Sequence, residues 1–99
     1  MSNQNQSDRP FTIHDILANG KNVLIRTVTN YFIGTVNDVD VSWVTLKPSA
    51  WVADSGRLSE ALKTGRLAEY EELPDGNMVM MPAVVDVIPW MHEIPRGSK

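Results

Sequence analysis

The chain has 99 residues, enough for one domain and too few for two. Hydrophobic residues make up 42% of it and charged residues 21%, so the middle of the chain can pack around a core and is not a disordered polymer. Nine Lys and Arg stand against twelve Asp and Glu. The net charge of −3 excludes a general attraction to phosphate backbones, so any nucleic-acid binding must be local.

The chain contains no Cys, which excludes disulfides, thiolate zinc sites and a thiol nucleophile. Secreted domains of this size are more often cross-linked, so we expect a cytoplasmic location. No apolar run approaches the roughly 18 to 20 residues that span a bilayer. Residues 1–10 are polar and lack the apolar centre of a signal peptide, so we expect a soluble chain without a membrane partner.

Residues 1–10 are rich in Asn, Gln and Ser, and we expect them to form a disordered tail. The next segment, residues 11–19, predicts a short helix that ends at Gly20. Two turns are too short to be stable alone, so the apolar face of this helix must lie on the sheet that follows. That face consists of Phe11, Ile13, Ile16 and Leu17.

Three runs of β-branched and aromatic residues follow, at residues 21–29, 31–40 and 42–47, and they predict three strands in a meander. Both faces of the first run are partly apolar. Asn30 is a natural turn residue between the first two strands, and Gly34 predicts a bend or bulge where a small barrel curls.

An insertion of residues 54–76 separates the third strand from the fourth. It opens with a turn, and residues 57–64 then place Leu and Ala on one side of a second short helix. Residues 67–76 are acidic and end in Pro-Asp-Gly, a turn signal, so we expect an exposed loop there.

Two short strands complete the sequence, at residues 77–81 and 83–88, and Pro82 separates them. We expect Trp90 to pack back on the domain and residues 91–99 to form a polar tail. The prediction is therefore a mainly β domain over residues 11–90. It is a small five-stranded SH3-like barrel with a short N-terminal helix and a helical insertion between strands three and four.

Two stretches of this pattern resemble the motifs of the Sm-like (LSm) family. The first motif resembles residues 16–46, in which the family's Gly-Lys step, glycine, hydrophobic residue and aspartate are Gly20-Lys21, Gly34, Val36 and Asp40. The second motif, a strand, a tight turn and a strand, resembles residues 79–88. The resemblance implies a non-enzymatic Sm-like barrel that assembles into a homo-oligomeric ring and binds single-stranded RNA. The insertion is similar to that of phage-type members.

The RNA-contacting positions depart from the family's pattern. Asp40 matches the aspartate of the loop after the second strand, but the family's base-contacting asparagine falls near Trp43. The Arg-Gly pair of the second motif is replaced by Met81-Pro82. Aromatic stacking can substitute for such contacts, so the candidate RNA-binding residues are Asp40, Trp43 and Met81. A Trp in this strand is also commonly a core or interface residue.

The last two strands are the candidate oligomer interface. Exposed strand edges invite pairing with another chain, and a heterologous contact that repeats can close into a ring. The Met group adds flexible apolar side chains that suit a subunit contact. The candidate interface residues are Met78, Val79, Met80, Met81, Val84, Val85 and Val87.

No residue pattern indicates catalysis, a cofactor or a metal. His14 and His92 are isolated from one another, and turn or loop roles explain Asp38, Asp40 and Asp54. Trp51 and Trp90, beside apolar neighbours, are expected to be packing groups.

Two functions remain open. One is a ring that binds single-stranded RNA. The alternative is a structural or adaptor protein whose inserted helix and acidic loop bind another protein, without RNA. The basic side of that helix, Arg57, Lys63 and Arg66, fits a solvated face as well as a phosphate contact.

Overall fold

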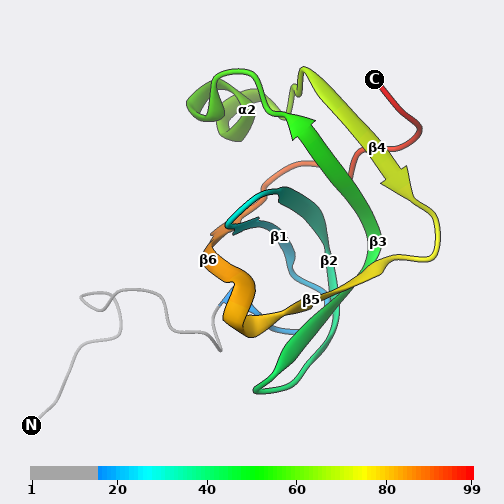
Figure 1. Ribbon diagram of the computed structural model, residues 1–99. Coiled ribbons are helices and arrows are strands. Elements are labelled where there is room, and N and C mark those ends of the chain that lie inside the picture. Colours follow the sequence, from blue (N-terminus) through cyan, green and yellow to red (C-terminus); the bar gives the residue numbers. More distant parts are fainter. Residues whose placement is uncertain (1–15) are drawn as a thin grey trace, which may run out of the picture.

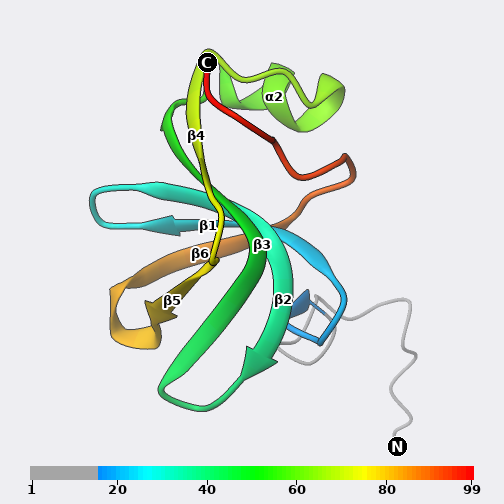
Figure 2. The ribbon, with the colours of Figure 1, turned by 90° about the vertical axis from the view of Figure 1, so that its right-hand side faces the viewer.

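The computed structural model (Figures 1 and 2) describes residues 16–99, and this part of the chain is mainly β. It contains one antiparallel sheet of six strands, one short α-helix and a 3-10 turn. In chain order these elements are β1 Asn22–Thr27, β2 Tyr31–Val39, β3 Trp43–Asp54, α2 Leu58–Thr64, β4 Glu69–Leu73, β5 Asn77–Met80, η2 Met81–Ala83 and β6 Val84–Pro89. Among the described residues no helix is long and apolar enough to cross a membrane.

The strands are ordered β4-β3-β2-β1-β6, and β5 also pairs with β3. The twelve residues of β3 therefore serve two partners along the edge that faces away from β2. Trp43–Leu46 pairs with β5, and Ser49–Asp54 pairs with β4. Figure 1 shows β5 at the lower end of β3 and β4 along its upper part.

The acidic segment that the sequence predicts as an exposed loop is the strand β4, so the sheet has six strands and not five. Its residues complete the edge of β3 that β5 leaves uncovered, and Tyr70 and Leu73 become half-buried while Glu69 and Glu71 stay exposed. The Pro-Asp-Gly turn is confirmed, since the Gly76 N–H donates to the Leu73 carbonyl at 2.9 Å.

The bend predicted at Gly34 is confirmed. The pairing of β2 with β3 shifts its register between Gly34 and Val36, as at a bulge. A Cβ at Gly34 would lie 2.8 Å from both the Leu46 Cβ and the Pro48 carbonyl oxygen, so glycine permits this close approach of the strands.

The two faces of the sheet each carry a core, because neighbouring residues of β1 point to opposite faces. Val23 and Ile25 lie in one core and Leu24 in the other. The first, here the β5–β6 core, consists of Leu17, Val23, Ile25, Val36, Val44, Leu46 and Val79. The second, here the insertion core, consists of Leu24, Ile33, Val52, Ala61, Leu67 and Trp90.

The predicted second helix is confirmed as α2. It ends at Gly65, which has φ +79° and donates its N–H to the Ala61 carbonyl at 2.8 Å. Ala61 and Leu67 are buried, so the inserted segment covers one face of the sheet and is more than a surface appendage. In both views α2 lies at the end of β3 opposite to β5 (Figures 1 and 2).

The predicted tail of residues 1–10 and most of the predicted first helix lie outside the described residues. Ile16 is helical, but Leu17 to Asn19 form bends and a turn, so the helix does not continue to Asn19 as predicted. Leu17 nevertheless packs in the β5–β6 core. Gly20 therefore does not end the helix directly. It lies in the turn before β1 with a φ of +88°, a conformation that glycine adopts without strain.

The chain after β6 returns along the insertion core to β4. Trp90 is buried, as predicted, and its indole N–H donates to the Glu93 carbonyl at 3.0 Å. Residues 94–99, here called the C-terminal segment, then run beside β4, as Figure 1 shows in red. Ser98 forms an isolated bridge with Glu71.

Candidate functional site

Among the described strands, β5 and β6 carry the most exposed apolar side chains. In the described part of the chain, β5 pairs with β3 alone and β6 with β1 alone, so each has an unpaired edge. Met78, Met80 and Val85 are 52%, 49% and 59% exposed. We call these two edges and three side chains the open edge.

The other candidate interface residues point inward. Val79 is buried in the β5–β6 core, and Met81, Val84 and Val87 pack against that core. Strand alternation explains the division, because Val79 lies between the two exposed methionines. Of the seven residues, those that a partner could reach over much of their surface are Met78, Met80 and Val85.

The three candidate RNA-binding residues come together at the turn between β2 and β3. The Asp40 N–H donates to the Trp43 carbonyl at 2.8 Å, and the Asp40 carboxylate accepts the Ser42 N–H at 3.1 Å. The Met81 N–H donates to the Ser42 carbonyl at 2.9 Å, which brings the start of η2 to the same turn.

This junction offers one exposed anion and two partly covered apolar groups. Asp40 is exposed, whereas Trp43 and Met81 are half-buried. Trp43 therefore has ring surface on which a base could stack, but the carboxylate of Asp40 repels phosphate. Chemically the junction favours contact with a base over contact with a nucleic-acid backbone.

An ion pair fastens β6 to β1 beside the open edge. Arg26 binds Asp86 through two hydrogen bonds, the Nε–H donating to Oδ1 at 2.7 Å and the Nη2–H to Oδ2. These hydrogen bonds lower the pKa of the Asp86 carboxyl below its ordinary value. Both side chains are 36% exposed, so solvent weakens the pair. The partners are far apart in the sequence, and no local pattern predicts this contact.

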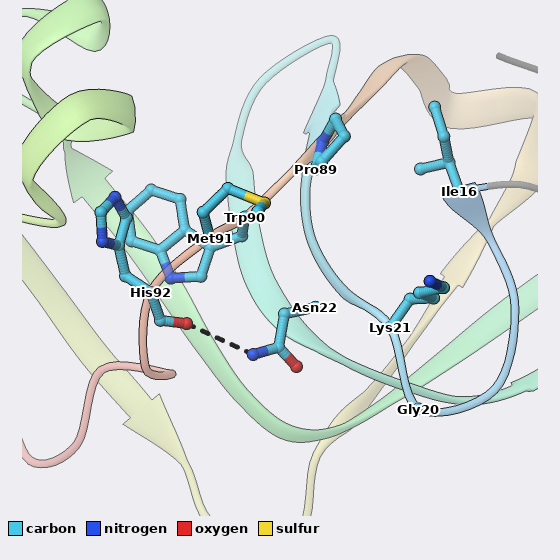
Figure 3. Close-up of a pocket in the computed structure, with 8 residues that line it drawn as sticks. All are labelled: Ile16, Gly20, Lys21, Asn22, Pro89, Trp90, Met91 and His92. Carbon is cyan, nitrogen blue, oxygen red and sulfur yellow. Dashed lines mark hydrogen bonds between the residues drawn. The ribbon is translucent and has the colours of Figure 1, made fainter. Parts of the chain in front are cut away.

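A pocket of about 580 Å³ lies between the turn before β1 and the chain after β6 (Figure 3). Trp90, Met91 and His92 form one side of it, and Lys21 lies on the other. The amide of Asn22, which Figure 3 shows between His92 and Lys21, is already engaged, since Nδ2 donates to the His92 carbonyl at 3.3 Å and Oδ1 accepts the Thr35 hydroxyl at 2.7 Å. The pocket thus presents a mixed polar and apolar surface with one lysine.

His92 has a structural role. Its Nε2–H donates to the Leu62 carbonyl in α2 at 2.8 Å, and its ring lies edge-on to that of Trp90 with centroids 5.1 Å apart. The prediction that Trp51 is a packing group is wrong in part, since its side chain is 36% exposed. Val52 takes the buried side of β3 there, and the Trp51 indole N–H donates to the Asn30 side chain at 3.2 Å.

The turn roles predicted for Asp40 and Asp54 are confirmed, because their carboxylates accept backbone N–H groups of their own turns, Asp40 from Ser42 and Asp54 from Gly56. The turn role predicted for Asp38 is wrong, since Asp38 lies in strand β2, where its carboxylate accepts the Val39 N–H. Within residues 16–99 no three His, Cys, Asp or Glu side chains gather as a metal site would require. His14 lies outside the described residues.

The β4 edge differs from the open edge in having a partner. Tyr70 and Lys99 exchange two backbone hydrogen bonds, at 3.0 and 2.9 Å, and the Glu72 N–H donates to the Gly97 carbonyl at 2.7 Å. The Glu72 carboxylate accepts the Gly97 N–H at 2.9 Å. Sequence reasoning missed this contact because nothing in residues 91–99 has the pattern of a strand.

Comparison with known proteins identifies no relative. No protein-family model, curated protein or solved structure matches the chain.

Proposed function

We propose that this chain is a non-enzymatic, Sm-like barrel subunit that assembles with copies of itself into a ring through the open edge. The observation that carries the proposal is the pair of unpaired strand edges, on β5 and β6, that bear Met78, Met80 and Val85. Unpaired N–H and C=O groups beside exposed apolar side chains favour the addition of a strand from another chain.

The geometry of the two edges favours a ring over a two-fold dimer. The edges of β5 and β6 are different surfaces of one molecule, joined by the three residues of η2. When β5 of one copy pairs with β6 of the next, the copy at each end of the row keeps one free edge until the chain of contacts closes. The arrangement strand, tight turn, strand also agrees with the motif resemblance that suggested the Sm-like fold.

Native mass spectrometry and light scattering at micromolar concentration test the assembly. We expect one closed oligomer whose mass does not grow with concentration. A stable monomer would contradict the proposal, and a mass that rises without limit would indicate open filaments in place of a ring.

Binding of single-stranded RNA is a second candidate function, favoured by the meeting of Asp40, Trp43 and Met81 at one turn. The test is a titration with short U-rich and A-rich RNAs at physiological salt, where nonspecific binding is weak. We expect Trp43→Ala to weaken binding while Trp51→Ala, which changes another partly exposed Trp, leaves it unchanged. Equal losses for both variants, or no binding above background, would exclude this site.

A structural or adaptor role is the alternative to RNA binding. It is favoured by the net charge of −3 and by the exposed Glu69 and Glu71 of β4. Removal of the insertion cannot test this role cleanly, because Ala61 and Leu67 belong to the insertion core. Charge reversals of exposed residues, such as Lys63→Glu on α2, change the surface without removing buried side chains.

A further inference from the structure

We propose that the edge of β4 is a docking site for an extended, basic segment of a partner protein, and that the C-terminal segment of this chain occupies it in the same manner. The inference rests on the adaptor role and gives it a surface and a class of ligand. It concerns a different edge from the one proposed for assembly.

The contact between β4 and the C-terminal segment is made mostly by backbone atoms. Tyr70 and Glu72 direct backbone groups away from β3 and toward Lys99 and Gly97. Backbone hydrogen bonds of this kind are available to another chain that has a glycine or asparagine at the position of Gly97, where φ is +71°, and they resemble strand addition to a sheet edge. The Glu72 carboxylate adds a further acceptor for the N–H of the added strand.

The charges of the two sides are complementary. The strand β4 carries Glu69, Glu71 and Glu72, whereas the segment it binds carries Arg96 and Lys99. Bonded strands lie about 5 Å apart, which is well within the screening length of about 8 Å at physiological salt. The field of β4 therefore favours a basic strand over an acidic one, even though the described residues form no ion pair between the two sides.

The contacts that hold the C-terminal segment on β4 allow another strand to replace it. Residues 96–99 are all exposed and contribute no side chain to either core, so little apolar burial is lost when they leave. Trp90 is buried and Ile94 packs against the insertion core, which keeps the segment tethered nearby. A tethered occupant competes with an outside ligand at an effective concentration on the order of 1 mM.

Gly97 offers a way to release the segment within the full-length chain. Its φ is +71°, and a Cβ there would meet no atom within 4 Å, so substitutions act through backbone conformation and not through a clash. Valine is strongly disfavoured at this φ, whereas asparagine tolerates it. Gly97→Val is thus expected to free the β4 edge, and Gly97→Asn is its matched control.

The experiment measures binding of a labelled peptide with the sequence of residues 93–99 to the wild-type chain and to both variants, by fluorescence anisotropy. We expect Gly97→Val to bind at least about tenfold more tightly than the other two. Arg96→Glu with Lys99→Glu in the peptide should abolish binding. The backbone amide resonances of Tyr70 and Glu72 should shift when the peptide binds. The substitution Glu71→Lys in the chain should weaken binding of the peptide.

Equal binding by Gly97→Val and Gly97→Asn, or amide shifts elsewhere, would overturn the inference. Dimerisation of Gly97→Val without peptide binding would also overturn it. If the peptide fails but a partner protein is bound and then lost on Lys63→Glu, the adaptor role stands and the β4 edge is excluded.

Discussion

The edge of β4 and the open edge of β5 and β6 belong to one sheet but meet their surroundings differently. The β4 edge is lined with glutamates and covered by the C-terminal segment, whereas the open edge bears Met78, Met80 and Val85 and has no partner among the described residues. Charged side chains on an edge strand discourage unwanted pairing, and a cover removes the opportunity for it. The open edge has neither of these protections among the described residues, so it is available for pairing with another chain.

The largest expected effect on stability tests whether the two faces of the sheet, and with them both edges, unfold as one cooperative unit. Leu24 is fully buried in the insertion core, while its neighbours Val23 and Ile25 face the other core. Leu24→Ala should lower the free energy of unfolding by about 2–5 kcal/mol. Urea denaturation followed by fluorescence and circular dichroism should show one transition for this variant and for Ile25→Ala. Two transitions in either variant would mean that the two faces unfold separately.

A smaller effect is expected on association, and it compares a charge placed on the open edge with the same charge placed outside the strands. Met80→Lys places a charge on the open edge and should weaken association by at least about tenfold, or about 1.4 kcal/mol. Met91→Lys makes the same change at an apolar residue that is 80% exposed and lies outside the strands. It should leave the oligomer intact. Analytical ultracentrifugation of both variants checks this, and equal weakening would show that general charge, not the edge, controls association.

The smallest effect concerns the ion pair that holds β6 in place. The pKa of Asp86 is lowered in the folded state, so the unfolded chain binds a proton there more readily and the pair stabilises the fold above the unfolded pKa of about 4. That contribution is lost as pH falls through the folded pKa. Asp86→Asn should cost under about 1 kcal/mol at pH 7, because the pair is one-third exposed. The cost should shrink toward pH 3 in urea titrations, and a cost that does not change with pH would assign it to packing.

The strands β1 and β2 and the first part of β3 could be predicted from the sequence, because they are runs of β-branched and aromatic residues. The strand β3 continues past Pro48 to Asp54, beyond the predicted residues 42–47. The strand β4 could not be predicted, since glutamate is depleted in strands. The segment Glu69–Leu73 pairs because β3 extends past the end of β5 and leaves an edge to fill. This uncovered part of the β3 edge is a property of the folded sheet, and the sequence of residues 69–73 gives no sign of it.

The candidate sites show the same limit. The pattern identified Met78 to Met81 as a strand with two apolar sides but could not tell which side the molecule covers itself. The structure places Val79 inward and leaves the methionines on either side of it outward. The motif resemblance groups Asp40, Trp43 and Met81, and their meeting at one turn depends on the pairing of β5 with β3.

The sharing of one β3 edge by two strands determines where the length of this chain can vary. Leu46 is opposite Asn77 and Ser49 is opposite Leu73, so the Pro-Asp-Gly turn must carry the chain past two residues of β3. One added residue in that turn would shift β5 by one position and turn Val79 outward. Between Asp54 and Glu69 the constraint is a different one, because Ala61 and Leu67 must still reach the insertion core. Length variants of this protein should therefore agree at residues 74–76.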